Sequence, residues 1–391
     1  MPWLLISLGW CWLPRVDSLL VPAQVHLIVG ARPNIMKVAP LFHSLQRESW
    51  SEPLLVHTGQ HYDPDMSDAL WNDLGLPEPH VHLGVGSGTH AEQTARVMVR
   101  YERTLLAGPP ACVVVVGDVN STLACTLAAK KLCINVAHLE AGLRSRNRRM
   151  PEEINRVATD ALADLLWTPS RDADENLLRE GVPPERIVRV GNIMMDSYEL
   201  LRPRISVART SRRWGLEPGE FGVLTLHRPD NVDGSDRLAA TLDVLERVSR
   251  RIPLVFPVHP RTAASLAAAD LRDRLDQMPG VVVSKPLGYV EFMSLVQESR
   301  LVVTDSGGLQ EETTYLGIPC LTLRDETERP ITVTMGTNRL VRLEGLEEAI
   351  LAVLDQGIPH GEHPEMWDGK TAHRVTASLR SALDGWSRSG R

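Results

Sequence analysis

The sequence predicts an α/β protein with two doubly wound, Rossmann-like domains that face each other across a cleft. Its 391 residues exceed what one hydrophobic core usually organises, so two domains are expected. Short apolar runs, typical of buried parallel strands, alternate with longer segments of helical spacing. This alternation stops in an arginine-rich stretch without periodicity at 202–217 and then starts again, which places the domain boundary near there.

The first domain is predicted to span 24–201. Its opening strand at 24–29 ends at Gly30 and leads into a helix at 33–46. Further strands are expected where short apolar runs recur, at 54–57, 112–116, 134–137, 165–168 and 187–190. Helices at 91–106 and 121–131 separate them, so the strands should be parallel and covered on both faces.

The second domain is predicted to span 202–370 and repeats this pattern. Its strands are again short apolar runs, at 222–226, 254–258, 281–283, 301–304 and 320–323. The remaining segment, 371–391, begins with a predicted helix at 371–383.

Residues 1–23 are predicted to be an N-terminal extension. They contain an apolar run at 4–13, for which a signal peptide is the alternative interpretation. No Lys or Arg precedes this run and no small-residue cleavage site follows it. The run is also too short to span a bilayer.

The composition is that of an ordinary globular protein, with 43% hydrophobic and 23% charged residues. A formal net charge of −7 argues against a nucleic-acid partner and against binding to an anionic membrane. The odd number of cysteines without paired spacing favours reduced thiols and a cytoplasmic location over a disulfide framework. These cysteines are Cys11, Cys112, Cys125, Cys133 and Cys320.

Three carboxylates lie where ligands bind in a parallel sheet. Asp118 follows the strand at 112–116, Glu140 follows the run at 134–137, and Glu152 lies in the first turn of a helix that begins at Pro151. Each alone could cap a helix or be solvated in a loop. Together they suit proton transfer on a small molecule better than a metal site, because the interleaved ligands of a cation loop are absent from this stretch.

A second candidate site follows the strand at 301–304. There Ser306, Gly307 and Gly308 lead into a helix, and glycines at a helix N-terminus allow a pyrophosphate to approach unpaired N–H groups. Glu312, one turn later, could accept both ribose hydroxyls. The alternative is a tight turn without a ligand. The pattern is not the Gly-x-Gly-x-x-Gly form, so NAD is not favoured.

Cations are needed opposite a pyrophosphate. Arg32, directly after the first strand, and Arg329, in the loop after the strand at 320–323, are the candidates because guanidinium groups match phosphate oxygens. His259 and Arg261 follow the strand at 254–258 and are weaker candidates, with helix capping as the alternative role.

These motifs, taken in order, resemble those of the non-hydrolysing UDP-N-acetylglucosamine 2-epimerases. The resemblance covers about 24–345. It rests on Gly-Ala-Arg-Pro-Asn-Ile-Met-Lys at 30–37, His-Thr-Gly-Gln-His at 57–61, Gly-Asp at 117–118, His-Leu-Glu-Ala-Gly-Leu-Arg at 138–144, Pro-Glu-Glu-Ile-Asn-Arg at 151–156, Leu-His-Arg-Pro at 226–229, Pro-Val-His-Pro-Arg at 257–261, Thr-Asp-Ser-Gly-Gly-Leu-Gln-Glu-Glu at 304–312 and Arg-Asp-Glu-Thr-Glu-Arg-Pro at 324–330.

The resemblance implies a fold like that of the GT-B glycosyltransferases, in which 371–391 returns to the first domain. It also implies elimination of UDP to a 2-acetamidoglycal and re-addition, without a cofactor. Asp118, Glu140 and Glu152 would be the acid–base group, and His227 would assist the departure of UDP. The resemblance places the following residues around the diphosphate or the acids: Arg32, Lys37, Arg156, Ser306, Gly307, Gly308, Glu312 and Arg329.

Several alternatives stay open at this stage. A hydrolysing 2-epimerase would release free N-acetylmannosamine, a glycosyltransferase would use the same nucleotide site with an acceptor, and a sensor would bind without turnover. The basic loop at 144–149 is similar to that of relatives acting on diacetamido-glucuronate nucleotides, so the substituents at C3 and C6 of the sugar are open. A homodimer is expected because it is the usual oligomer of soluble proteins.

Overall fold

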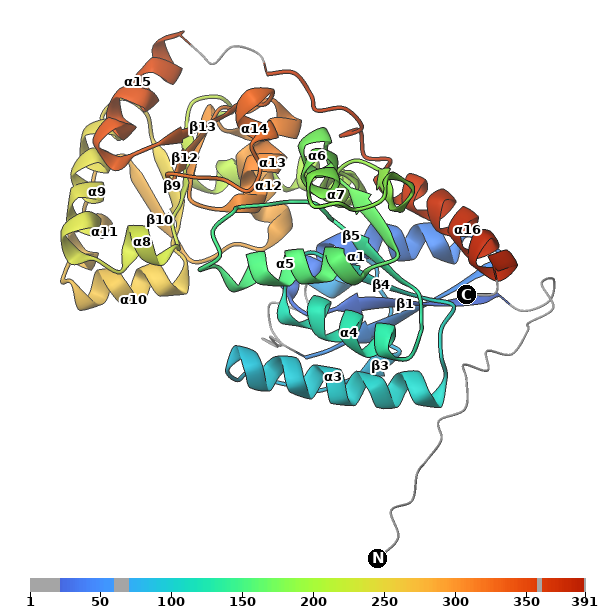
Figure 1. The fold of residues 1–391 in the computed structure, drawn as a ribbon. Coiled ribbons are helices and arrows are strands. Elements are labelled where there is room, and N and C mark those ends of the chain that lie inside the picture. Colours follow the sequence, from blue (N-terminus) through green and yellow to red (C-terminus); the bar gives the residue numbers. More distant parts are fainter. Residues whose placement is uncertain (1–21, 60–69, 357–360, 390–391) are drawn as a thin grey trace, which may run out of the picture.

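A computed structural model describes residues 22–59, 70–356 and 361–389. It contains two parallel sheets with helices on both faces, which confirms the predicted α/β fold (Figure 1). The apolar run at 4–13, Cys11 and the motif residues Gln60 and His61 lie outside the described residues. Within the described ranges no helix is long and apolar enough to cross a membrane.

The first sheet has seven parallel strands in the order β3-β2-β1-β4-β5-β6-β7. The order reverses between β1 and β4, and in such sheets ligands bind beyond the carboxyl ends of the strands at this point. The strands are β1 (Ala23–Val29), β2 (Ser51–His57), β3 (Val81–His82), β4 (Cys112–Val116), β5 (Val136–Leu139), β6 (Leu165–Thr168) and β7 (Ile187–Arg189).

The second sheet has six parallel strands in the order β10-β9-β8-β11-β12-β13, with its reversal between β8 and β11. Two short strands, β3 and β13, are absent from the expectations above because their residues are only partly apolar. The strands are β8 (Gly222–Thr225), β9 (Leu254–Pro257), β10 (Val281–Ser284), β11 (Leu301–Thr304), β12 (Cys320–Leu323) and β13 (Asn338–Val341).

Strand β5 begins two residues later than the run at 134–137 predicts. It therefore continues through His138 and Leu139, and Glu140 is the first residue after it. A buried histidine inside a strand breaks the apolar pattern, which is why the sequence placed the end of this strand too early.

Helices cover both faces of each sheet. In the first lobe they are α1 (Arg32–Gln46), α3 (His90–Ala107), α4 (Asn120–Lys131), α5 (Pro151–Leu162), α6 (Arg171–Arg179) and α7 (Ile193–Ala208). In the second they are α8 (Pro229–Val232), α9 (Ser235–Val248), α10 (Pro260–Ala268), α11 (Arg272–Asp276), α12 (Tyr289–Glu298), α13 (Gly307–Leu316), α14 (Ile331–Thr334) and α15 (Leu346–Gln356). Short 3₁₀ turns are Pro184–Arg186, Thr210–Trp214 and Leu343–Gly345.

Helix α7 contradicts part of the expectation for 202–217. It continues through Pro203 to Ala208, so 202–208 is helical rather than irregular. Leu201 and Ile205 are buried on this helix, and their packing compensates for the proline inside it. Position 202 therefore lies within a helix, and the division of the chain into 24–201, 202–370 and 371–391 stays a prediction.

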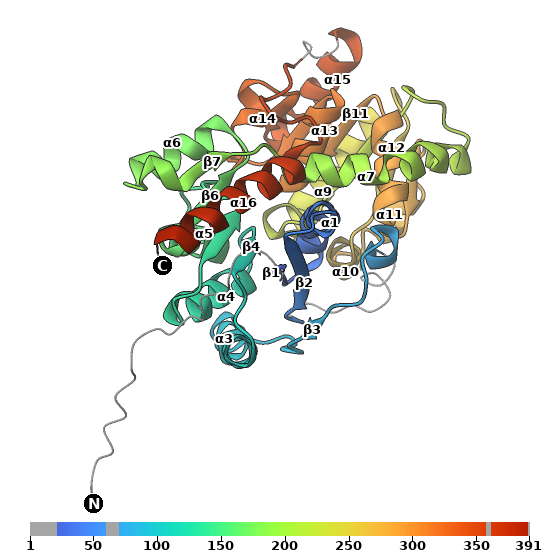
Figure 2. The same cartoon turned by 90° about the vertical axis from the view of Figure 1, so that its right-hand side faces the viewer.

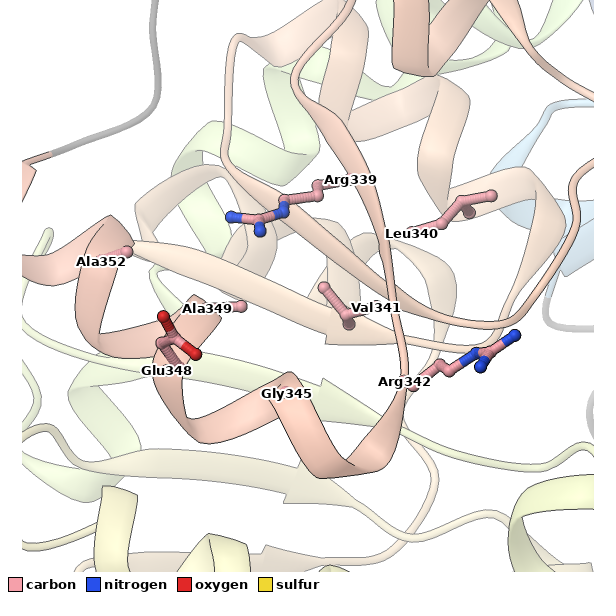
Figure 3. Close-up of a pocket in the computed structure, with 8 residues that line it drawn as sticks. All are labelled: Arg339, Leu340, Val341, Arg342, Gly345, Glu348, Ala349 and Ala352. Atoms are coloured by element: carbon pink, nitrogen blue, oxygen red, sulfur yellow. The ribbon is translucent and has the colours of Figure 1, made fainter.

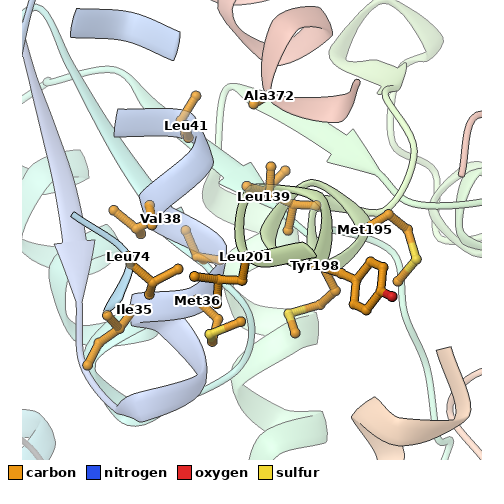
Figure 4. Close-up of a cluster of buried hydrophobic side chains, with 14 of the residues drawn as sticks. Ile35, Met36, Val38, Leu41, Leu74, Leu139, Met195, Tyr198, Leu201 and Ala372 are labelled. Carbon is orange, nitrogen blue, oxygen red and sulfur yellow. The ribbon is translucent and has the colours of Figure 1, made fainter. Parts of the chain in front are cut away.

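The last helix, α16 (Thr371–Ser389), packs on α1 and α7 (Figure 2). Its first two N–H groups, at Thr371 and Ala372, donate to the Asp196 carboxylate of α7 at 3.0 and 2.8 Å. Figure 4 shows the apolar cluster beneath, where α1 and α7 meet. Labelled members include Ile35, Met36, Val38, Leu41, Tyr198, Leu201 and Ala372.

Alternation along β4 separates the two faces of the first sheet. Val114 and Val116 belong to the core shared with α1, α7 and α16, whereas Val113 and Val115 belong to the core under α3 and α4. Helices α3, α4 and α5 form one layer on that second face (Figures 1 and 2).

Candidate active site

The structure brings the three predicted carboxylates to the carboxyl edge of the first sheet. Asp118 lies two residues beyond β4, Glu140 directly follows β5, and Glu152 is the second residue of α5. Helix α5 begins at Pro151, as expected for a proline in the first helical position.

Glu140 is held over the end of β4. Its backbone has φ +71°, a left-handed conformation that costs energy for a residue other than glycine and is typical of functional sites. Its Oε2 accepts a hydrogen bond from Lys37 Nζ on α1. A Cβ built at Gly117 would lie 3.2 Å from Oε2, so the carboxylate lies directly above the residue before Asp118. Its buried Oε1 has no hydrogen-bond partner among the described residues.

Asp118 and Glu152 line one pocket of about 290 Å³, at the point where α3, α4 and α5 begin. Asp118 Oδ2 accepts from Arg156 Nη2 at 2.5 Å, and its side chain keeps 30% exposure. Glu152 is half-buried, and no hydrogen bond to its carboxylate is found within the described ranges. Both acids therefore face open space, which a ligand needs.

A buried hydrogen-bond network supports the backbone next to Asp118 and Glu140. His138 Nε2 lies 2.9 Å from the Gly117 carbonyl oxygen and Nδ1 lies 2.6 Å from Asp160 Oδ1. Both partners are acceptors, so each ring nitrogen of His138 is placed to donate a hydrogen bond. Asp160 Oδ2 also accepts from Gly142 N at 3.0 Å. The network therefore joins the loop of Asp118 to the turn of Glu140.

The charge state of Asp160 agrees with this. Burial raises the pKa of the Asp160 carboxyl, but His138 and Arg144 lower it by more, and the net shift is downward. Arg144 Nη2 lies 2.8 Å from Asp160 Oδ2, and both side chains are almost fully buried. The pair is therefore ionised at neutral pH.

In the second lobe the Ser-Gly-Gly turn leads into α13. Ser306 is the residue before the helix, and Gly307 and Gly308 are its first two residues. A Cβ at Gly307 would lie 2.9 Å from Arg329 Nη1 and 2.9 Å from Glu328 Oε1, so only glycine fits without displacing them. The helix N-terminus and Arg329 thus lie side by side, as expected for an anion site.

Arg329 is almost fully buried and paired. It lies 3.0 Å from Glu311 Oε1 and 2.8 Å from Glu328 Oε1. Burial lowers the pKa of its guanidinium, while Glu311, Glu328 and Glu140 raise it, and the net shift is upward. Glu140 belongs to the first lobe, so the charged groups of both lobes lie within electrostatic reach of one another.

Glu312 lies on α13 and accepts a hydrogen bond from Tyr289 Oη at 2.7 Å. Burial raises the pKa of the Glu312 carboxyl to about 7, against the opposing effect of that hydrogen bond. The group therefore titrates near neutral pH, unlike an ordinary glutamate.

His227 follows β8, and its Nδ1 lies 2.8 Å from Oδ1 of the buried Asp305. The N–H groups of His227 and Arg228 both donate to Asp305 Oδ2 at 2.9 Å, which fixes this turn. His259 lies beside it, with ring centroids 5.4 Å apart. Burial, together with the neighbouring His227, lowers the pKa of His259.

Arg32 and Arg261, two of the predicted phosphate-binding cations, lie in different environments. Arg32 is the first residue of α1, half-buried, at the carboxyl end of β1. Arg261, by contrast, is exposed and its guanidinium binds Asp233 at 2.5 and 2.9 Å. His259 accepts from Arg261 N at 3.2 Å and so caps α10, the alternative role noted above.

The sequence did not single out Asp305, Tyr289 or Asp160. Asp305 follows a strand end as Asp118 does, and the same rule would have found it. Tyr289 and Asp160 act through contacts with Glu312 and His138, which are distant in sequence. Among the described residues no cluster of three or more His, Cys, Asp or Glu side chains is suited to a metal ion.

A further pocket of about 260 Å³ lies between β13 and α15 (Figure 3). It lies at the outer edge of the second sheet, and none of the predicted site residues lines it. Its lining residues are Arg339, Leu340, Val341, Arg342, Gly345, Glu348, Ala349 and Ala352.

Comparison with known proteins agrees with this geometry. The family model described as UDP-N-acetylglucosamine 2-epimerase matches residues 43–380. The chain belongs to the UDP-N-acetylglucosamine 2-epimerase family. This confirms the resemblance drawn from the sequence motifs.

Individual members of this 2-epimerase family match over nearly the whole chain. The UDP-N-acetylglucosamine 2-epimerase of Methanocaldococcus jannaschii is 41% identical over 368 residues, which cover 91% of this chain and 98% of that protein. A UDP-2,3-diacetamido-2,3-dideoxy-D-glucuronate 2-epimerase of Pseudomonas aeruginosa is also 41% identical, over 81% of this chain and 88% of that protein.

Solved 2-epimerase structures share the fold. The M. jannaschii enzyme in complex with UDP-GlcNAc and UDP superposes with a TM-score of 0.80 at 38% identity, covering 92% of this chain and 99% of that one. The Neisseria meningitidis enzyme bound to UDP-GlcNAc gives 0.82 at 26% identity, covering 92% and 100%. The expected GT-B-like fold, with two lobes, is thereby confirmed for this 2-epimerase family member.

Proposed function

We propose that this chain catalyses the reversible epimerisation at C2 of UDP-N-acetylglucosamine to UDP-N-acetylmannosamine, or of a closely related UDP-2-acetamido sugar. The observation that carries this proposal is that Glu140 and Lys37 of the first lobe lie within electrostatic reach of Arg329 and Glu311 of the second. Acid–base groups on one sheet thereby lie opposite a glycine turn on the other. Family membership supports the same reaction.

The proposed chemistry is elimination followed by re-addition. The C1–O bond breaks and its electron pair leaves with UDP, while a base removes the proton from C2 and a C1=C2 double bond forms. UDP then adds back to C1 as an acid delivers a proton to the opposite face of C2. This requires proton-transfer groups on both faces of the sugar ring, which one carboxylate cannot provide.

We assign the acid–base roles to Asp118, Glu140 and Glu152. Glu140 has a buried Oε1 with no hydrogen-bond partner in the described part of the chain, and Asp118 and Glu152 line one pocket. Lys37 forms an ion pair with Glu140, and Arg156 forms one with Asp118, so both carboxylates are positioned by direct contact. His227, oriented by Asp305, assists the departure of UDP.

We assign the diphosphate to the N-terminus of α13 and to Arg329, with Arg32 and His259 at the edges of the site. Ser306, Gly307 and Gly308 would supply N–H donors, and Glu312 would accept from the ribose hydroxyls. Binding requires Arg329 to exchange part of its contact with Glu311 and Glu328 for phosphate oxygens, since its guanidinium is already paired.

Incubation in deuterated water tests the reaction. An epimerase exchanges deuterium into C2 of UDP-N-acetylglucosamine without any acceptor and forms UDP-N-acetylmannosamine. A glycosyltransferase or a sensor would give no exchange. Net release of UDP in phosphorus NMR would favour the hydrolysing reaction instead.

A second candidate substrate is a UDP-2,3-diacetamido glucuronate. Two observations favour it: Arg148 and Arg149 are exposed in the loop before α5, and the P. aeruginosa relative is named for that substrate. Asn147 Nδ2 of this loop donates to Glu326 Oε1 of the second lobe at 3.1 Å, so the loop borders the cleft. Parallel assays with both nucleotide sugars decide between them by kcat/KM.

The pKa of Glu312 predicts a pH dependence of UDP affinity. The ionised carboxylate accepts ribose hydroxyls, and its fraction falls as pH drops through about 7. We therefore expect the Kd for UDP, measured by calorimetry, to rise by at most about tenfold when the pH is lowered from 8 to 6. This limit is the factor by which the ionised fraction of Glu312 falls over that range. Tyr289→Phe removes a hydrogen bond that lowers this pKa, so the weakening should begin at higher pH.

Glu312→Gln is the matched control, because it keeps the side-chain shape and lacks the titration. The phosphate of UDP titrates near pH 6 as well, and this variant reports that contribution alone. Equal pH dependence in wild type and Glu312→Gln would exclude Glu312 as the titrating group.

We further propose a homodimer, a cytoplasmic location and a role in supplying precursors for surface polysaccharide. Cys112, Cys125 and Cys320 are free, buried thiols, which supports a reducing compartment.

A further inference from the structure

Glu311 is a buried carboxylate to which the proposed reaction gives no chemical role. It is the fifth residue of α13, one turn beyond Gly307, and only 2% of it is exposed. Its Oε1 lies 3.0 Å from Arg329 Nε, whereas its buried Oε2 has no hydrogen-bond partner in the described part of the chain. Burying a carboxylate is costly unless a cation or several hydrogen bonds compensate its charge.

Arg329 is the one cation in direct contact with Glu311 among the residues that the structure describes. Lys37 lies within electrostatic reach, but its Nζ is bound to Glu140, an acid of the other lobe that also acts on Glu311. Glu312, the next residue of α13, adds a further carboxylate nearby. The charge of Glu311 therefore depends mainly on one guanidinium.

Glu328 contacts the same guanidinium but has a second cation. Its Oε1 lies 2.8 Å from Arg329 Nη1, and its Oε2 lies 3.0 Å from Arg324 Nη2. Burial raises the pKa of the Glu328 carboxyl, but Arg329 and Arg324 lower it by more. For the Glu311 carboxyl, burial raises the pKa by more than Arg329 lowers it, and the net shift is upward. A loss of contact with Arg329 is therefore expected to affect Glu311 first.

The diphosphate needs the guanidinium that Glu311 holds. A Cβ at Gly307 would lie 2.9 Å from Arg329 Nη1, so Arg329 extends along α13 from its N-terminus to Glu311. A diphosphate bound at this N-terminus and Glu311 therefore compete for one cation. The diphosphate cannot lose its charge and is also bound by helix N–H groups, whereas a buried carboxylate can become neutral.

We propose that Glu311 takes up a proton from solvent when a diphosphate draws Arg329 away from it. The proton binds the carboxylate, and no other covalent bond forms or breaks. The uptake removes a buried negative charge that would repel both the diphosphate and Glu140. Glu311 is thus a positioning residue, which holds Arg329 in the empty site and releases it to the ligand as a neutral acid. This inference rests on the diphosphate assignment of the proposed function.

Calorimetry of UDP binding in buffers of different ionisation enthalpy counts the protons. Between about pH 8 and about pH 9 we expect uptake approaching one proton per UDP, because buried glutamates can reach a pKa of about 8–9. By reciprocity the Kd for UDP should rise by up to about tenfold over this range. Glu311→Gln imitates the neutral acid, so it should show no uptake and a Kd almost independent of pH there.

Glu312→Gln is the matched control, because it changes the neighbouring carboxylate of the same helix. Glu312 and the phosphate of UDP bind in their ionised forms in the proposed site, so they release protons on binding rather than take them up. Uptake should therefore persist in Glu312→Gln. Equal proton numbers in wild type and Glu311→Gln would overturn the proposal. Failure of the wild type to bind UDP would overturn the diphosphate assignment as well, whereas binding without uptake overturns this inference alone.

Infrared difference spectroscopy detects the proton without relying on a variant. Binding of UDP to the wild type at about pH 8 should produce the carbonyl band of a protonated carboxylic acid. Isotope labelling of the protein separates this band from the uracil carbonyls of UDP, and its loss in Glu311→Gln assigns it to Glu311. If no acid band appears in the wild type, the proposal is wrong even where Glu311→Gln fails to fold.

Discussion

Glu140→Gln should lower kcat by about 10³-fold while the Kd for UDP changes little, because general acid–base groups contribute factors of about 10² to 10⁴. The substitution keeps the shape of the side chain and a contact with Lys37, but it removes the negative charge of the buried carboxylate. Asp118→Asn and Glu152→Gln should also abolish turnover and retain UDP binding. Steady-state kinetics and calorimetry measure the two effects separately.

Asp164→Asn is the control for the Glu140 prediction. Asp164 is a half-exposed carboxylate of the first lobe, paired with Lys130 at 2.7 Å outside the cleft, so kcat should stay near the wild-type value. A wild-type kcat in any two of the Asp118, Glu140 and Glu152 variants would refute the proposed assignment of the site. A parallel loss of UDP affinity would instead indicate damage to the fold of the cleft.

Asp160→Asn should destabilise the protein by about 3–5 kcal/mol, the usual cost of removing one member of a buried ion pair. The Asp160 and His138 side chains are fully buried. An amide at 160 would remove the carboxylate that His138 and Arg144 both contact, and Arg144 would keep only its ion pair with Glu180. Urea unfolding followed by circular dichroism measures this loss.

The same variant should lose catalytic rate more than substrate affinity. Asp160 touches neither sugar nor diphosphate in the proposed site; it acts through His138 on Gly117 and directly on Gly142. Misplacement of Asp118 and Glu140 by about 1 Å would lower kcat by up to about 10²-fold, with a smaller change in KM. Glu175→Gln, which breaks an exposed pair with Arg171, should leave both stability and kcat nearly unchanged. Wild-type kcat in Asp160→Asn would show that the network has no positioning role.

The two buried carboxylates of α13 differ for a physical reason. Glu311 faces Arg329, while Glu312 faces the phenol of Tyr289, a weaker partner for a negative charge. Adjacent residues on a helix point about 100° apart, so one reaches the lobe interface and the other the inner side of α12. Spacing along the sequence alone could not distinguish their environments.

The sequence by itself determined most of the strands, the α/β class with two domains, and the family. Apolar runs that end at glycine or at an acid are local signals, and they placed Asp118, Glu152 and the Ser-Gly-Gly turn correctly at element ends. Where a buried histidine or a proline broke the local signal, as His138 does in β5 and Pro203 does in α7, the expected boundaries were wrong.

Only the tertiary structure decided which groups meet. The contacts of Glu140 with Lys37, of His138 with Asp160 and of Glu312 with Tyr289 join residues 103, 22 and 23 positions apart, and no periodicity in the chain encodes them. The burial of the polar row of α5 was equally invisible, because a helix with one polar and one apolar row has the same sequence whichever row is buried. The buried residues of α5 are Glu153, Asn155, Arg156, Thr159 and Asp160. The polar row turns inward here because Asp118 and His138 need partners that solvent would screen.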